Sequence, residues 1–228
     1  MCGRFILILE PGDLEEELDL GGIPESYLPR YNIAPTQPVA AVKNESDSKV
    51  EMLKWGLIPF WAKDPAIGSK MINARSETLL EKPSFKNLVP SHRALILSSG
   101  FYEWNQNPHP EFKLKQPFLF FLPDTKVYAF AALWTEWKAP SGEIIPSTTI
   151  ITTQANRMMQ PFHDRMPVIL DHNTMWEWMR PDLKAAEAMK LLTPYAESKM
   201  DFYPVDPMVS NPRNDRPECI QRVQPFLF

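Results

Sequence analysis

Residues 127–134 read Val-Tyr-Ala-Phe-Ala-Ala-Leu-Trp, an unbroken apolar run whose aromatic and aliphatic side chains favour a buried β-strand. Comparable runs occupy residues 93–99, 117–122 and 144–153. Residues 38–55 hold two apolar stretches around a polar turn, which predicts a hairpin. The middle of the chain is therefore predicted to form a sheet.

Helical patterns lie near the two ends of the chain. A Pro-Gly-Asp turn with leucines at helical spacing follows residue 10 and predicts an acidic surface helix. Asp171 and Asp182 are suited to cap helices, so residues 172–193 are predicted to form two of them. We expect further strands at 167–170 and 200–205 and a surface loop at 207–217.

These patterns predict an α+β protein with a mainly antiparallel, barrel-like central sheet and peripheral helices. No internal repeat or linker divides the sequence, so we expect a single domain over residues 1–228. The 24 prolines among 228 residues, with 44% hydrophobic residues, indicate a packed core rather than a low-complexity chain.

Charge and cysteine content exclude several classes of protein. The net charge of −4 argues against binding nucleic acid through bulk charge, although a short basic cleft stays compatible with it. The only cysteines, Cys2 and Cys219, form neither a disulfide framework nor a CxxC metal pattern. No apolar run approaches the roughly 20 residues that span a bilayer, so we expect a soluble intracellular protein.

Four short polar motifs interrupt the apolar pattern, at residues 1–4, 72–77, 100–104 and 162–167. They contribute a thiol, an amide, a carboxyl and an imidazole, which is a combination typical of a catalytic site. The candidate catalytic residues are Cys2, Asn73, Glu103 and His163.

Cys2 carries the most information of these four. Removal of Met1 would give Cys2 a free α-amine, with a pKa of about 7.7–8.0, next to its thiol. Such a residue condenses with an aldehyde to an imine, and the thiol then closes a five-membered thiazolidine. The alternative is a frayed chain terminus with an incidental cysteine.

Glu103 and His163 are candidates for general acid and base catalysis. Glu103 lies between two aromatic residues, where loss of solvent would raise the pKa of its carboxyl. The alternative for Glu103 is a salt-bridged carboxylate at a strand end. His163 is expected in a loop before a strand, where a merely solvated histidine is the alternative.

Asn73 and Arg75 are two residues apart, so on an extended segment their side chains share a face. The amide could bind a substrate oxygen and the guanidinium a phosphate. A turn-capping asparagine and a surface arginine are the alternatives. Trp104 fits a core position or a stacking surface for single-stranded nucleic acid.

Six motifs in order carry a resemblance to a known family: residues 1–5, 30–36, 55–59, 73–78, 100–104 and 163–167. Together they resemble the SRAP family, the SOS-response-associated peptidase proteins that shield abasic sites in single-stranded DNA. The resemblance implies an α+β fold with a barrel-like sheet, and neither a metal nor an organic cofactor.

The resemblance also implies roles for individual residues. Cys2 matches the residue that crosslinks to DNA, Asn73 and Glu103 match residues lining that site, and His163 matches an acid/base histidine. The implied partner is single-stranded DNA containing abasic sites, contacted by Arg4, Asn32, Pro35, Arg75, Trp104 and Arg165. We expect a monomer without membrane association, cytoplasmic and, in a bacterium, associated with the nucleoid.

Two other functions fit the same residues. Cys2, His163 and Asn73 could form the triad of a thiol autopeptidase or of an N-terminal-nucleophile amidohydrolase. A nucleophile at residue 2 is poorly placed to cleave long substrates, so we restrict such proteolysis to removal of Met1. A non-catalytic reader of damaged DNA, in which Cys2 would be dispensable, is the third possibility.

Overall fold

Five strands form a closed ring in the computed structural model, which describes residues 2–106, 112 and 114–224. The ring closes because β10 pairs with β9 on one side and with β4 on the other. Apolar and β-branched residues fill these strands, as expected for strands buried on a shared interior. In ring order they are β4 (Val50–Trp55), β3 (Pro38–Lys43), β6 (Arg93–Ser98), β9 (Tyr128–Lys138) and β10 (Ile144–Gln154).

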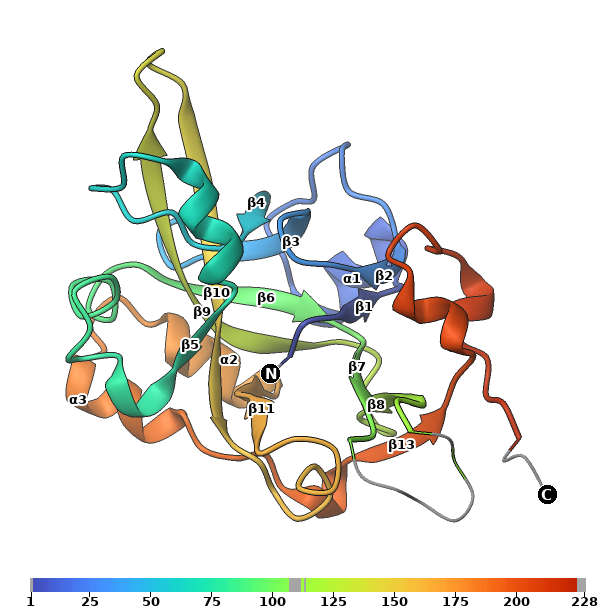
Figure 1. Cartoon of the computed structure of the whole chain (residues 1–228). Coiled ribbons are helices and arrows are strands. Elements are labelled where there is room, and N and C mark those ends of the chain that lie inside the picture. Colours follow the sequence, from blue (N-terminus) through green and yellow to red (C-terminus); the bar gives the residue numbers. More distant parts are fainter. Residues whose placement is uncertain (1, 107–111, 113, 225–228) are drawn as a thin grey trace.

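A second, open sheet lies beside the ring (Figure 1). All of its pairings are antiparallel. Only Ser99 separates β6 of the ring from β7 of this sheet, so the two sheets are joined directly. In order its strands are β13 (Asp201–Pro204), β8 (Pro117–Phe121), β7 (Gly100–Trp104), β1 (Phe5–Leu7) and β2 (Arg30–Ile33).

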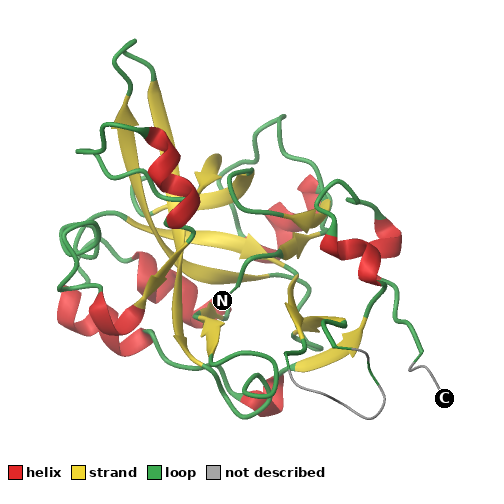
Figure 2. Ribbon diagram, in the orientation of Figure 1, coloured by secondary structure: helices red, strands yellow, loops and turns green. Residues whose placement is uncertain are grey.

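Helices and short strands surround the two sheets (Figure 2). The α-helices are α1 (Pro11–Leu18), α2 (His172–Met179) and α3 (Ala185–Ala188), and α2 packs beside β6 and β9. Three short strands pair alongside ring strands. β5 (Asn73–Arg75) and β11 (Arg165–Pro167) pair with β10, and β12 (Ile169–Leu170) pairs with β9. The 3-10 turns are η1 (Pro65–Lys70), η2 (Ser76–Thr78), η3 (Met189–Leu191), η4 (Glu197–Lys199), η5 (Pro207–Ser210) and η6 (Pro217–Ile220).

The core joins the ring to the second sheet through aromatic side chains. Phe5 of β1 meets Trp55 and Phe130 of the ring edge-on, with ring centroids 5.2 and 5.6 Å apart. Phe101 of β7 stacks on Phe120 of the neighbouring strand at 5.3 Å. Because Phe5 is fully buried, the first strand of the chain is fixed to both sheets.

The predicted α+β architecture with a barrel-like, mainly antiparallel sheet is confirmed. Residues 38–55 form the expected antiparallel hairpin, and the apolar runs became β6, β8, β9 and β10. Two pairings are parallel, those of β10 with β4 and with β5. No described helix is long and apolar enough to cross a membrane.

Two local predictions were wrong. Asp182 does not cap a helix: its carboxylate pairs with Arg180, and α3 is a single turn that begins after Lys184. Residues 207–217 are not a plain surface loop, because η5 lies within them and Val209 is fully buried. Pro-rich and polar composition suggested a loop, whereas long-range contacts hold this segment against the protein.

We predict that Gly56→Ala lowers the free energy of unfolding by at least about 2 kcal/mol. Gly56 has a φ of +131°, and a Cβ there would lie 2.5 Å from the backbone oxygen of Gly68. Urea unfolding measures the effect. Gly12→Ala is the control, since a Cβ at Gly12 meets nothing within 4 Å, and we expect it to be neutral or up to about 1 kcal/mol more stable. Equal urea midpoints for the Gly56 variant and the parent would contradict the prediction.

Candidate active site

Cys2 and β1 are buried in the protein, and β1 pairs with β7. Phe5 pairs with Phe101 and Ile6 with Gly100, and the backbone N–H of Tyr102 donates to the carbonyl of Arg4 at 2.9 Å. Gly100 leaves room for both neighbours of β7, because a Cβ there would lie 3.0 Å from the backbone oxygen of Phe120 in β8 and 3.3 Å from Cδ1 of Ile6 in β1. The residues before β1 are thereby held next to the strand that carries Glu103.

Cys2 is fully buried and is held by Asn73. The Nδ2 of Asn73 donates to the Cys2 carbonyl at 2.9 Å. Asn73 begins β5, where parallel pairing with Ile150 of β10 fixes its position. Its Oδ1 is also buried and accepts no hydrogen bond within the described part of the chain. The site thus contains a buried acceptor beside Cys2.

Glu103 approaches Cys2 from β7. Side chains alternate along a strand, so Glu103 shares the interior face of Phe101, and it is only 4% exposed. Burial raises the pKa of the Glu103 carboxyl to about 7. Burial also raises the pKa of the Cys2 thiol, and the nearby charge of Glu103 raises it further. The thiol of Cys2 is therefore protonated at neutral pH in this environment.

His163 lies in the loop before β11, as the sequence predicted. Its Nδ1 is 2.9 Å from the backbone nitrogen of Arg165 and 2.7 Å from Oδ1 of Asp164. Burial lowers the pKa of His163 below its usual value of 6.5. The imidazole is consequently neutral in most molecules at pH 7, a state in which it can accept a proton.

A hollow of about 400 Å³ opens beside this loop, lined by Arg75, Gln154, Ala155, Gln160, Asp164 and Arg165. A second one of about 240 Å³ is lined by Gln106, Gln160, Pro161, Phe162, His163 and Asp164. Both are lined by Gln160 and Asp164, so the two hollows adjoin, and together they are called here the depression beside His163. Within the described residues, no group of three or more His, Cys, Asp or Glu side chains could hold a metal ion.

The two arginines of this depression differ in their surroundings. Arg75 is exposed and makes no ion pair within the described residues. Arg165 is 8% exposed, and its guanidinium binds both carboxylate oxygens of Glu77, at 2.6 and 2.9 Å. These hydrogen bonds lower the pKa of Glu77. Arg75 therefore presents the more accessible positive charge.

Residues 1–212 match the family model described as SOS response associated peptidase (SRAP). The chain belongs to the SRAP family. It is 42% identical to "Abasic site processing protein YoqW" of Bacillus subtilis (strain 168), over 97% of this chain and 99% of that protein. It is 31% identical to "Abasic site processing protein HMCES" of Mus musculus, over 86% of this chain and 66% of that protein. A crystal structure of a Bacteroides thetaiotaomicron protein matches with a TM-score of 0.84 and 26% identity, covering 97% of this chain and 100% of that one.

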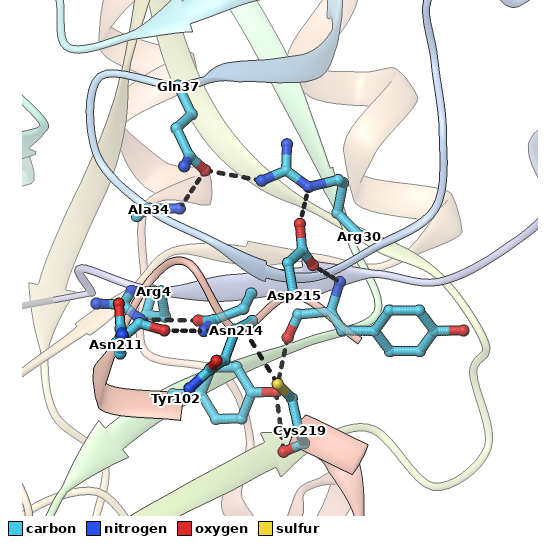
Figure 3. A network of polar contacts seen from close by, with 11 residues as sticks. Arg4, Arg30, Ala34, Gln37, Tyr102, Asn211, Asn214, Asp215 and Cys219 are labelled. Carbon is cyan, nitrogen blue, oxygen red and sulfur yellow. Dashed lines mark hydrogen bonds and ion pairs between the residues drawn. The ribbon is translucent and has the colours of Figure 1, made fainter. Parts of the chain in front are cut away.

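Four residues that the SRAP resemblance linked to DNA do not line the depression beside His163. Trp104 follows Glu103 on β7 and so takes the opposite face, where its Nε1 donates to Ser210 Oγ at 3.1 Å. Arg4 lies against the same carboxy-terminal segment (Figure 3), with its guanidinium 5.7 Å from the Trp104 ring centre. Asn32 is fully buried. Pro35 is half-buried in the turn between β2 and β3.

Sequence reasoning missed two groups near the candidate site. Tyr128 is fully buried on β9; burial raises the pKa of its hydroxyl, and the nearby thiol of Cys2 raises it further. In the sequence, Tyr128 is one of several aromatic residues in the apolar run 127–134, and nothing sets it apart. Glu77 lay inside a quoted motif, but nothing local indicated that it pairs with an arginine 88 residues later.

We predict that Glu103→Gln alters the pH dependence of stability. Below pH 4.5 the carboxyl is neutral in both folded and unfolded states. From pH 4.5 to about 7 the unfolded chain loses the proton first, so the parent loses stability relative to the variant, by up to about 3 kcal/mol. Above pH 7 the difference is constant.

Urea unfolding of both proteins from pH 4 to 8 measures this difference. Glu143→Gln, at an exposed position, controls for the substitution itself. A difference between parent and Glu103→Gln that does not change with pH would show that Glu103 is not desolvated as described.

Proposed function

We propose that this protein acts on abasic sites in single-stranded DNA and, after removal of Met1, joins to them covalently through Cys2. The names of the Bacillus subtilis and mouse relatives support abasic sites as the target. The observation that carries the proposal is the position of Cys2, fully buried between the amide of Asn73 and the carboxyl of Glu103.

The proposed reaction begins with the sugar of the abasic site. An abasic deoxyribose is mainly a closed hemiacetal, so opening requires a proton on the ring oxygen and loss of the proton of the C1′ hydroxyl. The resulting aldehyde is attacked by the α-amine of Cys2, and loss of water gives an imine. The thiol then adds to the imine carbon and its proton passes to the nitrogen, which closes the thiazolidine. One water leaves overall, and nothing is oxidised or reduced.

Glu103 and His163 would divide the proton transfers. With a pKa of about 7, the Glu103 carboxyl is protonated in about half of the molecules at neutral pH and can give a proton to the ring oxygen. The neutral imidazole of His163 is suited to move protons during imine formation and during reversal of the linkage. The Asn73 Oδ1 acceptor would orient a sugar hydroxyl or the amine.

A few cationic contacts would bring the DNA to this site. Arg75 faces the depression beside His163, and we assign it the first phosphate contact. Arg165 lines the same hollow, but Glu77 already binds its guanidinium, so its contact with DNA would require exchange of that partner. So small a set of contacts is compatible with a net charge of −4.

A second activity, removal of Met1 by the protein itself, is supported by the peptidase description of the family. The Cys2 thiol would add to the Met1 carbonyl, and the peptide C–N bond would break as a proton passes to the Cys2 nitrogen. Water would then hydrolyse the resulting thioester, which releases methionine and restores the thiol. A nucleophile at residue 2 that acts on the carbonyl just before it is poorly placed to cleave a long substrate chain. We therefore confine the proposed proteolysis to the protein's own terminus.

We expect the protein, once freed of Met1, to form a heat-resistant adduct with single-stranded DNA bearing an abasic site and none with intact DNA. Intact-mass measurement should give the sum of the two masses less one water. Cys2→Ser should retain an imine that borohydride traps but lose the stable ring. Extra residues before Cys2 should abolish both products. Fully processed protein that forms no adduct would refute the proposed function.

We expect Glu103→Gln and His163→Ala to act on different steps. The glutamine variant should slow crosslinking by about 10²- to 10⁴-fold with little change in DNA affinity, because it cannot donate the ring-opening proton. In the parent this step should slow as pH rises through about 7, the pKa of Glu103. His163→Ala should act more on imine interconversion and on release. Single-turnover crosslinking and release across pH measure both, and parent rates in both variants would remove the two assignments.

A further inference from the structure

The segment 207–220, called here the carboxy-terminal strap, is bound to residues from the beginning of the chain (Figure 3). Val209 and Cys219 of the strap are fully buried. Its partners come from β2, β7 and the residues just after Cys2. The strap therefore packs against segments that precede it by more than 100 residues.

Asn32 is the central link to the strap. It is fully buried on β2, and its Nδ2 lies 3.1, 3.2 and 2.6 Å from the carbonyl oxygens of Val209, Asn211 and Asn214. Its Oδ1 accepts from Nη1 of Arg4 at 2.8 Å. Both ends of this amide are thus engaged, one with the strap and the other with Arg4.

Arg4 links the strap to the segment that contains Cys2. Its Nη1 also donates to the Val209 carbonyl at 2.5 Å, and its own carbonyl accepts from the Tyr102 N–H at 2.9 Å. Only Gly3 separates Arg4 from Cys2, and Tyr102 directly precedes Glu103. A shift of Arg4 would therefore move Cys2 relative to Glu103.

The strap has anchors that do not involve Arg4. Asp215 pairs with Arg30 and accepts from the backbone N–H of Tyr31 at 2.6 Å. Gln37 Oε1 accepts from Arg30 at 2.9 Å and from the backbone of Ala34 at 3.0 Å. The Tyr203 hydroxyl donates to the Ile220 carbonyl at 2.8 Å. The strap is thus held independently and can act as a fixed reference.

We propose that Arg4 and Asn32 are positioning residues, which transfer the fixed position of the strap to Cys2 and hold its amine and thiol beside Glu103. The inference rests on the proposed function and replaces the DNA contacts that the sequence suggested for these two residues. Terminal residues fray unless they are tied down. Displacement of a reacting group by about 1 Å can cost about 10²-fold in rate, so a device that fixes residue 2 has a direct chemical effect.

Arg4→Met separates this role from DNA binding. We expect its crosslinking rate at saturating abasic single-stranded DNA to fall by about tenfold to a hundredfold, with unchanged affinity and salt dependence for intact single-stranded DNA. Arg4→Lys keeps the charge, but its ammonium lies one bond closer to the backbone than Nη1, the atom that binds both acceptors, so its rate should also fall. Tyr203→Phe is the matched control: it removes one hydrogen bond at the far end of the strap, whereas Asp215 and Asn32 still hold the part beside Arg4, so it should keep the parent rate.

Three results would overturn the proposal. A parent rate at saturation in Arg4→Met, with weakened DNA affinity, would assign Arg4 to DNA binding. A full rate in Arg4→Lys would assign the effect to charge. A loss in Tyr203→Phe equal to that in Arg4→Met would assign it to general destabilisation.

Alkylation of Cys2 tests the same inference without DNA. Iodoacetamide is applied to the folded proteins, and peptide mapping distinguishes Cys2 from Cys219. Cys2 is fully buried, so we expect Arg4→Met to raise its alkylation rate about tenfold or more and Tyr203→Phe to leave it unchanged. If the parent forms no DNA adduct, the proposed function fails and this measurement alone decides the positioning role. Equal Cys2 alkylation in parent and Arg4→Met would refute it.

Discussion

The pairing of β1 with β7 carries the beginning of the chain into the interior, and the candidate site depends on it. Fixing a residue costs about 1–2 kcal/mol of backbone entropy, a cost that terminal residues normally avoid by fraying. Here it is offset by the burial of Phe5 against Trp55 and Phe130 and by the hydrogen bond from Asn73 to Cys2. Packing of the aromatic core of the two sheets thus offsets the entropy cost of ordering residue 2.

The same burial sets the protonation of the groups around Cys2. Loss of solvent disfavours a charged form, so it raises the pKa of the Glu103 carboxyl to about 7 and lowers that of the His163 imidazole. At neutral pH the carboxyl is then an available acid and the imidazole an available base. Burial disfavours the ionised carboxylate of Glu103 and the protonated imidazole of His163, so it shifts their two pKa values in opposite directions. Under the proposed function, burial therefore makes Glu103 the acid and His163 the base.

The sequence predicted most of the architecture because buried strands leave a local signal. The apolar run at 127–134 became part of β9, and the polar turn after residue 43 marked the β3–β4 hairpin. The polar motifs also pointed to Cys2, Asn73 and Glu103, which the structure brings together. Alternation along β7 could already have separated Glu103 from Trp104, since neighbouring strand residues face opposite sides.

Local patterns could not reveal the long-range pairings. The strap was predicted as a surface loop because the side chain that binds its carbonyl groups, Asn32, lies almost 180 residues earlier in the sequence. Arg4 and Arg165 matched DNA-contacting arginines of the SRAP resemblance, yet in the structure each is bound by protein groups. A short motif specifies a residue type, whereas the partner of that residue depends on the whole fold.

These pairings bear on how an acidic protein would retain a polyanion. Of the site arginines, Arg4 is bound to Asn32 and Arg165 to Glu77, which leaves Arg75 as the exposed one. One or two phosphate contacts give weak, salt-sensitive attraction, and the net charge of −4 opposes it at long range. Under the proposed function, those contacts need only bring the sugar to Cys2. The covalent bond, rather than Coulomb attraction, then holds the DNA, so the positions of Cys2 and Glu103 matter more to retention than the number of basic residues.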